Sequence, residues 1–334
     1  MSENYKFKLS IIVAIYNIEH EIKDLLKQLE EVRKLPEVEI LLLDDGSKDN
    51  TPIVLDQLRQ SDNFQVLHLE NSGLSGVRNH GIILSRGEYL WFVDGDDLID
   101  PYLVKNEINL ITENKIDFLQ FRYERFDQPQ DIQFDPANAN VEHVERVSSD
   151  EWLERLNDFR NMQYENYAWD HIVKKSVYVD NQITFPLNRN YEDIATTYQL
   201  VNAVGQITVI DNVGYFYRNR SGSITNTHSQ KNIDDMLRAV DEFQKKENLS
   251  FSDENKQNFV HKNLVGAYYM AIKLPKLEKK RIKEYVTQHI LANDLHVLRN
   301  KYKFEYLLFK FNIYDLYSKC VKFAKKMIGR GSDD

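Results

Sequence analysis

The sequence has a single cysteine, Cys320, among 334 residues, so no disulfide can form within the chain. This favours a reducing compartment such as the cytosol. Glycine (12 residues) and proline (7 residues) are also scarce, which argues against long linkers. No apolar run approaches the roughly 18 residues that a transmembrane helix needs, and the polar segment 1–10 does not resemble a signal peptide. We therefore expect a cytoplasmic protein.

The chain has fewer basic than acidic residues. It contains 43 Lys and Arg residues and 52 Asp and Glu residues, which give a net charge of -9. A balance of this sign disfavours nucleic-acid binding by the chain as a whole. The hydrophobic fraction of 42% is large enough for a sizeable core. The length is compatible with two domains or one large domain.

The first 125 or so residues alternate between strand and helix patterns. Apolar, β-branched runs predict buried strands, and these runs lie at residues 9–16, 38–43, 64–69, 89–93 and 117–123. Helical patterns fill the intervals, which predicts an α/β fold with a mostly parallel sheet flanked by helices. Residues 126–145 read as a loop, residues 150–230 as mixed, and the chain from about residue 231 as helical.

Polar residues follow each of the first four predicted strands. They are Tyr16-Asn17, Asp44-Asp45-Gly46-Ser47, Asn71-Ser72-Gly73 and Asp94-Gly95-Asp96-Asp97, in chain order. Each group taken alone can be an ordinary turn, since these residue types are common turn formers. The carboxyl ends of parallel strands meet at one edge of a sheet, however, and ligands bind there. We therefore expect the four groups to share one site.

Three carboxylates within the stretch 94–97 need a counter-charge to stay ionised together. Mg²⁺ or Mn²⁺ supplies one, and it fills its remaining positions with substrate phosphates. The stretch is thus expected to hold a metal that in turn holds a diphosphate. Gly95 permits close approach of the backbone to a ligand, and Arg78 at a helix start can add a positive contact. The chain has no G-x-G-x-x-G after the first strand and no P-loop motif.

Four motifs in order, SIIVAIYNIEHEI, LLLDDGSKDNT, ENSGLSGVRNHGI and YLWFVDGDDLIDP, resemble those of the family 2 glycosyltransferases with a GT-A fold. Members of this kind build bacterial capsules, exopolysaccharides, teichoic acids and adhesin glycans. The resemblance is strong over residues 9–105, fair over 165–228 and absent after about 235. It implies a catalytic domain at 1–230, with a nucleotide-binding half (1–125) and an acceptor half (126–230). The helical pattern of the remaining chain predicts a helical region at 231–334.

The resemblance implies roles for matching positions in the nucleotide-binding half. The nucleotide-sugar site is expected to contain Ala14, Tyr16, Asn17, Asp45, Asn71, Arg78, Asp94 and Gly95. Within it Tyr16 is expected to stack on uracil. Asp96 is the expected main metal ligand, with Asp94 facing the ribose or the metal. Relatives commonly have proline where this chain has Ala14.

The acceptor half contains NYEDIATTYQL, in which the resemblance implies that Asp193 is the general base and Glu192 its neighbour. The alternative is that these acids only begin a helix, where negative charge is favourable. Arg218 and Arg220 in GYFYRNRSGSIT are expected to offset charge on the departing nucleotide, unless they are solvated residues of a surface hairpin. His228 is a candidate metal ligand, although a lone histidine is more often structural. Trp169 either stacks on a sugar or belongs to the core, and His171 stands where relatives usually have lysine.

The resemblance implies a metal-dependent inverting glycosyltransferase that moves one hexose or N-acetylhexosamine from a UDP-sugar. The acceptor is a hydroxyl of a glycan, carried by a lipid-linked oligosaccharide or a glycoprotein. The chain lacks the Q-x-x-R-W signature of processive synthases, which favours transfer of one sugar per encounter. Two alternatives remain at this point, a nucleotidyltransferase and a non-catalytic scaffold or chaperone subunit with the same fold.

The segment 301–330 is aromatic and basic, with eight Lys and Arg residues against two acids. One hypothesis is a helix that lies on the inner face of an anionic membrane, close to a lipid-linked acceptor. The other is a helix that packs on its own fold or on a second copy of the chain. Cys320 is expected to be a small apolar core residue.

Overall fold

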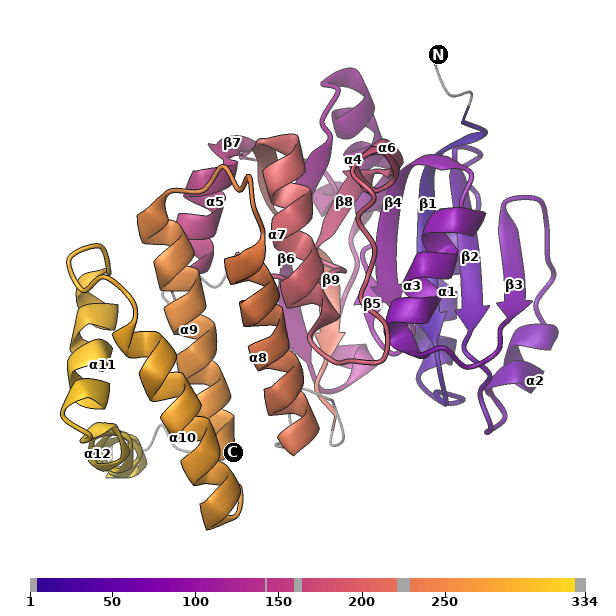
Figure 1. Ribbon diagram of the computed structural model, residues 1–334. Helices are drawn as coiled ribbons and strands as arrows, with labels where there is room; N and C mark the ends of the chain where they lie inside the picture. The colour runs from indigo at the N-terminus through magenta and orange to yellow at the C-terminus, as the bar shows by residue number, and fades with distance from the viewer. Residues whose placement is uncertain (1–4, 142, 159–163, 221–228, 328–334) are drawn as a thin grey trace. The chain divides into compact units, whose positions relative to one another are not determined.

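A computed structural model describes residues 5–141, 143–158, 164–220 and 229–327 of the chain (Figure 1). The chain forms two compact units. The first comprises residues 1–227 and 248–250, and the second comprises residues 228–247 and 251–334.

The first unit is built on one sheet. In the described residues its nine strands follow the order β3-β2-β1-β4-β8-β6-β9-β5, and β7 also pairs with β9. The strands are β1 (Phe7–Ile15), β2 (Val38–Asp44), β3 (Phe64–His68), β4 (Gly87–Asp94), β5 (Leu98–Ile99), β6 (Phe118–Phe126), β7 (Glu145–Ser148), β8 (His171–Lys174) and β9 (Gln206–Arg218).

The sheet changes character part-way across. Strands β3, β2, β1 and β4 are all parallel, as the sequence pattern predicts. The short strand β8 then lies antiparallel between β4 and β6. β6 and β9 are parallel to each other, whereas β5 and β7 run antiparallel to β9. The α/β fold class is confirmed, and the second half of the sheet is mixed.

Helices connect the strands of this unit (Figure 1). They are α1 (Ile22–Val32), α2 (Thr51–Asp56), α3 (Gly73–Leu84), α4 (Leu103–Glu113), α5 (Ser149–Leu156), α6 (Lys175–Asp180) and α7 (Glu192–Val204). The pattern of α1 illustrates why they dock, since Ile22, Leu25, Leu29 and Val32 fall on one face at helical spacing and are buried. The short 3₁₀ helices at Pro129–Asp131 and Pro136–Asn138 lie in the segment that was expected to be a loop.

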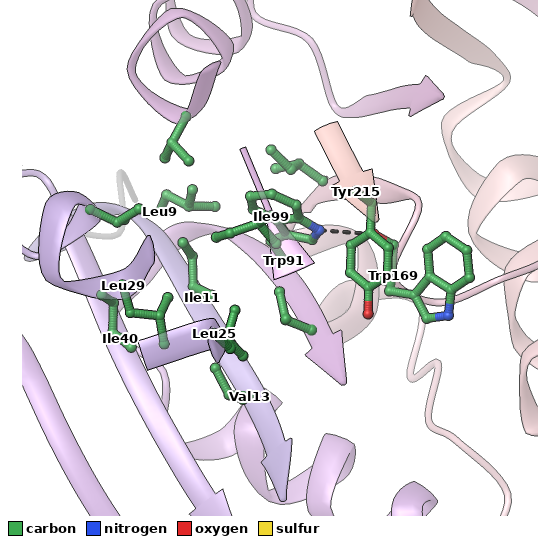
Figure 2. Packing of buried hydrophobic residues seen from close by; sticks show 14 of the residues in the cluster. Leu9, Ile11, Val13, Leu25, Leu29, Ile40, Trp91, Ile99, Trp169 and Tyr215 are labelled. Atoms are coloured by element: carbon green, nitrogen blue, oxygen red, sulfur yellow. Dashed lines mark hydrogen bonds between the residues drawn. The ribbon is translucent and has the colours of Figure 1, made fainter. Parts of the chain in front are cut away.

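The core between sheet and helices holds the carboxyl ends of the strands in place. Leu9, Ile11 and Val13 of β1 are fully buried, and they belong to one apolar cluster with Leu25 and Leu29 of α1 (Figure 2). Strand β2 is buried along its whole length, as expected of a strand covered on both faces.

A hydrogen bond links the two halves of the sheet. Nε1 of Trp91, on β4, donates to the backbone carbonyl of Trp169 at 2.9 Å (Figure 2). The segment before β8 is thereby fixed beside β4. The segment just before β8 therefore lies beside β4, although the two are far apart in the sequence.

The second unit is helical. Its elements are α8 (Gln230–Lys245), α9 (Asp253–Ala271), α10 (Lys276–Leu291), α11 (Asn300–Lys310) and α12 (Tyr314–Met327). Side-chain oxygens of Ser229 and Ser252 cap the first two of these helices. Among the described residues, we find no helix with the length and apolar content that crossing a bilayer requires.

The prediction that Cys320 is a core residue is wrong. The side chain is exposed on α12, because this last helix buries Tyr314 and presents Cys320 from another face.

Candidate active site

A cavity of about 420 Å³ lies in the first unit at the carboxyl ends of β1, β2 and β4. The sequence-predicted residues that line it are Ala14, Tyr16, Asp45, Asn71, Arg78, Asp94, Asp96, Trp169, Glu192, Asp193 and Arg220. The chain thus brings together residues that are up to two hundred positions apart. Asn17, Gly95 and Arg218 do not line the cavity, and His228 lies outside the described residues.

One end of the cavity is formed by the loops after β1 and β2. The Asp45 carboxylate accepts hydrogen bonds from the backbone N–H groups of Ser72 at 2.7 Å and Gly73 at 2.8 Å. The Asn71 amide donates to the Asp45 carbonyl at 2.8 Å. Tyr16 is 49% exposed. This end therefore combines a fixed carboxylate with an accessible aromatic ring.

Arg78 of α3 joins the two acidic parts of the cavity. Its Nη2 donates to Asp94 Oδ1 at 2.9 Å, and its Nη1 donates to Glu192 Oε1 at 2.6 Å. The guanidinium is almost fully buried, and a buried charge is stable only when it is paired in this way. Arg78 thereby connects the carboxyl end of β4 with the start of α7.

Asp96 is the carboxylate that faces Arg220. Arg220 Nε lies 2.7 Å from Asp96 Oδ2. Burial, followed by the nearby Asp94 carboxylate, raises the pKa of Asp96, although Arg220 acts in the opposite direction. An additional cation beside Asp94 and Asp96 would favour the ionised form of both.

Asp97 has a structural role that differs from that of its neighbours. It is buried, and its carboxylate accepts from Tyr215 Oη at 2.7 Å and from the Arg218 backbone N–H at 2.8 Å. Tyr215 Oη in turn accepts from the Asp94 backbone N–H at 3.1 Å. Asp97 thus attaches the end of β9 to the turn after β4, and burial raises its pKa well above the ordinary range.

Arg218 points away from the cavity, contrary to its expected contact with the nucleotide. Its Nε donates to the Asp96 carbonyl at 2.6 Å, and its Nη2 lies 3.2 Å from an Asp24 oxygen. The guanidinium also packs over the Phe126 ring. Because all these partners are protein groups, Arg218 holds the acidic turn in position. The exposed Arg220 is the arginine of this pair that lines the cavity.

Glu192 and Asp193 begin helix α7 and also line the cavity. Asp193 is half-buried and accepts from the Ile194 backbone N–H at 2.7 Å. Burial, followed by the Glu192 carboxylate, raises the pKa of Asp193 above the ordinary range. The preceding residue, Tyr191, has a left-handed backbone with φ 58°, which is uncommon for a residue other than glycine. This conformation sets the direction in which the helix enters the cavity wall.

Trp169 lines the cavity but has no free face for a sugar. Its ring stacks on Tyr167 at a centroid distance of 4.5 Å and on Tyr215 at 4.2 Å, with interplanar angles of 10° and 11°. Only 3% of Trp169 is exposed. The structure therefore contradicts stacking of a sugar on Trp169 and places it in the core of the wall. Tyr167 and Tyr217, which stack against it, also line the cavity.

The other predicted positions outside the cavity have local structural roles. Asn17, with φ 51°, donates its backbone N–H to Ser47 Oγ at 2.9 Å. A Cβ added to Gly95 would lie 2.6 Å from Ile18 Cδ1, so this glycine permits close packing of the chain rather than of a ligand. His171 is buried in contact with Asp170, and burial lowers its pKa to about 3. It is therefore neutral and does not replace the lysine of relatives.

Sequence reasoning did not identify Tyr167, Tyr191 and Tyr217 as cavity residues. Each lies within two residues of a predicted position, and Tyr217 shares a strand face with Tyr215, two positions earlier on β9. Proximity to motif residues was the available signal. It was ambiguous because tyrosine is abundant in this chain, with 19 residues.

The acids of the cavity fit a divalent metal only in part. Two carboxylates, those of Asp94 and Asp96, face the same space, and Mg²⁺ commonly uses one or two carboxylates together with substrate phosphates. Within the part of the chain that the structure describes, no group of three or more His, Cys, Asp or Glu side chains is arranged to hold a metal ion. A metal at this position would therefore depend on the substrate for ligands.

Comparison with known proteins agrees with this geometry. The sequence profile described as Glycosyl transferase family 2 matches residues 10–176, which is half of the chain. The chain belongs to this family. The matched segment contains the strands β1–β4 and the acidic turn, and it ends just after β8. The predicted family is thereby confirmed, and the chain is a glycosyltransferase.

Curated relatives carry the same class of description. Glycosyltransferase GlyG of Streptococcus pneumoniae serotype 4 is 29% identical over 225 residues, which cover 66% of this chain and 73% of GlyG. The putative glycosyltransferase EpsH of Bacillus subtilis is 25% identical over 228 residues, covering 67% of this chain and 64% of EpsH. The match thus spans about two thirds of EpsH.

A solved structure has the same fold. The Staphylococcus aureus TarS fragment 1-349 in complex with UDP-GlcNAc superimposes with a TM-score of 0.69 at 23% identity, over 87% of this chain and 83% of the fragment. The predicted GT-A architecture with a helical C-terminal region is confirmed by this likeness.

Proposed function

We propose that this glycosyltransferase moves one hexose or N-acetylhexosamine from a UDP-sugar to a hydroxyl of a glycan acceptor, with inversion at the anomeric carbon. The observation that carries the proposal is the arrangement of acids in one cavity. Asp94, Asp96 and Asp193 all line it, and Arg78 pairs with Asp94 and with Glu192, the neighbour of Asp193. An inverting transfer needs a diphosphate site and a base on opposite sides of the reacting carbon.

A UDP-sugar is the proposed donor. Tyr16, Asp45 and Asn71 form an end of the cavity that suits a nucleoside, because it offers a ring for stacking and fixed polar groups. The similarly folded TarS fragment has been solved with UDP-GlcNAc and with UDP, which supports the uridine nucleotide and makes UDP-GlcNAc the first donor to test. Residues 1–125 would then serve as the nucleotide-binding half and residues 126–230 as the acceptor half.

A divalent cation, Mn²⁺ or Mg²⁺, is the proposed cofactor, and Asp94 and Asp96 would hold it. When bound, it neutralises charge on the diphosphate. A mannosyltransferase from Pyrobaculum calidifontis with a similar fold (TM-score 0.52, 12% identity) has been solved with GDP-Man and Mn²⁺. In our proposal Arg220, which pairs with Asp96, adds positive charge where the diphosphate departs.

Asp193 is the proposed general base. Its carboxylate takes the proton of the acceptor hydroxyl, the hydroxyl oxygen forms a bond to C1 of the sugar, and the bond between C1 and the diphosphate oxygen breaks. UDP leaves with the electron pair of that bond. A raised pKa increases the proton affinity of Asp193 and therefore suits it to this task. The acceptor must lie beside Tyr167 and Tyr191, which border the Asp193 side of the cavity.

The decisive experiment measures UDP release and sugar transfer from a panel of UDP-sugars, with Mn²⁺ and with EDTA. Asp96→Asn should weaken UDP binding and metal-dependent release together. Asp193→Asn should keep the shift of the melting temperature by UDP and lose transfer to an acceptor. Asp180→Asn, which changes an exposed acid of the same unit, should behave as the wild type.

Several results would contradict the proposal. If no UDP-sugar releases UDP and UDP does not raise the melting temperature, the donor is not a UDP-sugar. If Asp193→Asn still transfers sugar at the wild-type rate, the base is another group. A response to nucleoside triphosphates instead would favour a nucleotidyltransferase, and binding without turnover in any condition would favour a scaffold.

A further inference from the structure

Helices α11 and α12 of the second unit are neighbours (Figure 1) and share an exposed apolar surface. We call this surface the α11–α12 face, and its large exposed side chains are Phe304, Leu307, Phe311, Ile313, Leu316 and Tyr317. Phe311 and Leu316 are each 65% exposed. Soluble proteins seldom gather so many large apolar side chains in one exposed place without a partner.

The face is continuous across the two helices. The rings of Phe304 and Tyr317 meet edge to face at a centroid distance of 5.4 Å. The sides of α11 that bury Tyr302, Leu308 and Phe309 supply the core contacts. The exposed apolar residues are therefore additional to those that hold the unit together.

Lysines border the face, and the nearby acids are already paired. Lys310 lies about one helical turn after Leu307, and Lys319 lies about one helical turn after Leu316. Each lysine is therefore on the same side of its helix as the leucine before it. Both lysines are exposed, and within the described ranges no carboxylate lies within ion-pair distance of either. Asp315 accepts from Tyr268 and from Lys283 at 2.8 Å.

The other acid of the segment, Glu305, is also turned inward. Its Oε2 lies 3.3 Å from Nε2 of His261, which is fully buried. With both acids engaged, the surface beyond them is cationic. The whole chain, in contrast, carries a net charge of -9, so positive charge is concentrated where the apolar side chains are exposed.

We propose that the α11–α12 face is a peripheral docking surface for an anionic phospholipid membrane. Aromatic and aliphatic side chains would enter the interfacial layer, and lysines would contact the headgroups. The charge of the face favours a membrane over a second copy of the chain. A two-fold contact would bring Lys310 and Lys319 of one copy close to the same positive face of the other copy, and like charges repel. The inference goes beyond the sugar transfer proposed above, since it involves no residue of the cavity.

The test is cosedimentation of the full chain with vesicles of phosphatidylcholine alone and of phosphatidylcholine mixed with phosphatidylglycerol. We expect binding only to the mixed vesicles, and weaker binding as salt is added. Lys310→Gln with Lys319→Gln should weaken partitioning by about 30-fold, at about 1 kcal/mol per lysine. Phe311→Ser with Leu316→Ser should weaken it by at least about tenfold.

A matched control and a local probe complete the design. Leu277→Ser alters another exposed leucine of the same unit, 83% exposed on α10, and should leave partitioning unchanged. Cys320 is the single cysteine and is exposed on α12. An environment-sensitive fluorophore attached there should shift to shorter wavelength with the mixed vesicles only. Circular dichroism and melting temperature verify that each variant is folded.

Three results would overturn the proposal. The first is equal partitioning to both kinds of vesicle or to neither. The second is wild-type partitioning by both double variants. The third is a concentration-dependent dimer, detected by sedimentation velocity without vesicles, that Phe311→Ser with Leu316→Ser dissociates. This third result would identify the face as a contact between copies of the chain.

Discussion

The carboxylic acid of Glu107, on α4, is predicted to make the first unit less stable as the pH rises. Glu107 is fully buried, and neither of its carboxyl oxygens has a hydrogen-bond partner among the described residues. One of them lies against Gly214 of β9, where an added Cβ would approach it to 3.1 Å. Burial, followed by the Asp100 carboxylate, raises the pKa of Glu107 to about 8.

The sign follows from the proton balance. The unfolded chain loses this proton near the ordinary pKa of 4.5, whereas the folded chain keeps it to about pH 8. Between these values the unfolded state binds fewer protons, so the free energy of unfolding falls with rising pH. At 1.36 kcal/mol per pKa unit, the cost reaches about 2 kcal/mol at pH 6 and about 4 kcal/mol at pH 8.

Glu107→Met removes the titrating group at similar volume and should remove this slope. The difference between variant and wild type in free energy of unfolding should therefore grow by about 2 kcal/mol between pH 6 and pH 8. Urea unfolding followed by tryptophan fluorescence is the suitable assay, because Trp91, Trp152 and Trp169 all lie in the first unit. Glu113→Gln, an exposed acid on the same helix, is the control. Parallel pH profiles for Glu107→Met and wild type would refute the reasoning.

Three further predictions concern the site and its support. Glu192→Gln removes a charge that raises the pKa of Asp193. The acid limb of the pH profile of kcat should therefore move to lower pH. An acid limb that does not move would show that another group titrates. Gly95→Ala places a Cβ within 2.6 Å of a neighbouring side chain and should cost about 1–3 kcal/mol in urea unfolding, whereas an unchanged midpoint would mean that the turn relaxes freely. The Asp44 carboxylate, 2.7 Å away, raises the pKa of His68, so Asp44→Asn should lower the pKa measured by NMR titration; an equal pKa in both proteins would contradict this pairing.

The first half of the fold could be predicted because its signals are local. Strands β1, β2 and β4 are mostly apolar runs buried on both faces, and each is followed by a short polar turn. The position of β8 could not be predicted in this way. It has four residues and pairs antiparallel with both β4 and β6, and the segment before it accepts a hydrogen bond from Trp91. A contact between residues so far apart in the chain leaves no periodic pattern.

The composition of the cavity was easier to predict than the direction of its side chains. The motif that contains Asp96 and Asp97 places two identical residues in adjacent positions, and only the fold distinguishes them. Both border the cavity, but Asp96 pairs with Arg220, whereas Asp97 is buried and accepts hydrogen bonds from β9. Arg218 and Arg220 differ in the same manner. In each pair the buried residue, Asp97 or Arg218, is held by protein groups that are distant in the sequence.

The placement of Arg78 has a consequence for protein engineering. One guanidinium balances a carboxylate from the donor side, Asp94, and one from the base side, Glu192. These three positions cannot be varied independently, because losing Arg78 leaves two carboxylates without their shared cation, and losing either carboxylate changes the charge that the other one shares with Arg78. A library that alters donor choice through Asp94 would therefore also alter the surroundings of Asp193. If Asp94 contacts the donor and Asp193 is the base, as proposed, donor specificity and acceptor activation are a single design variable.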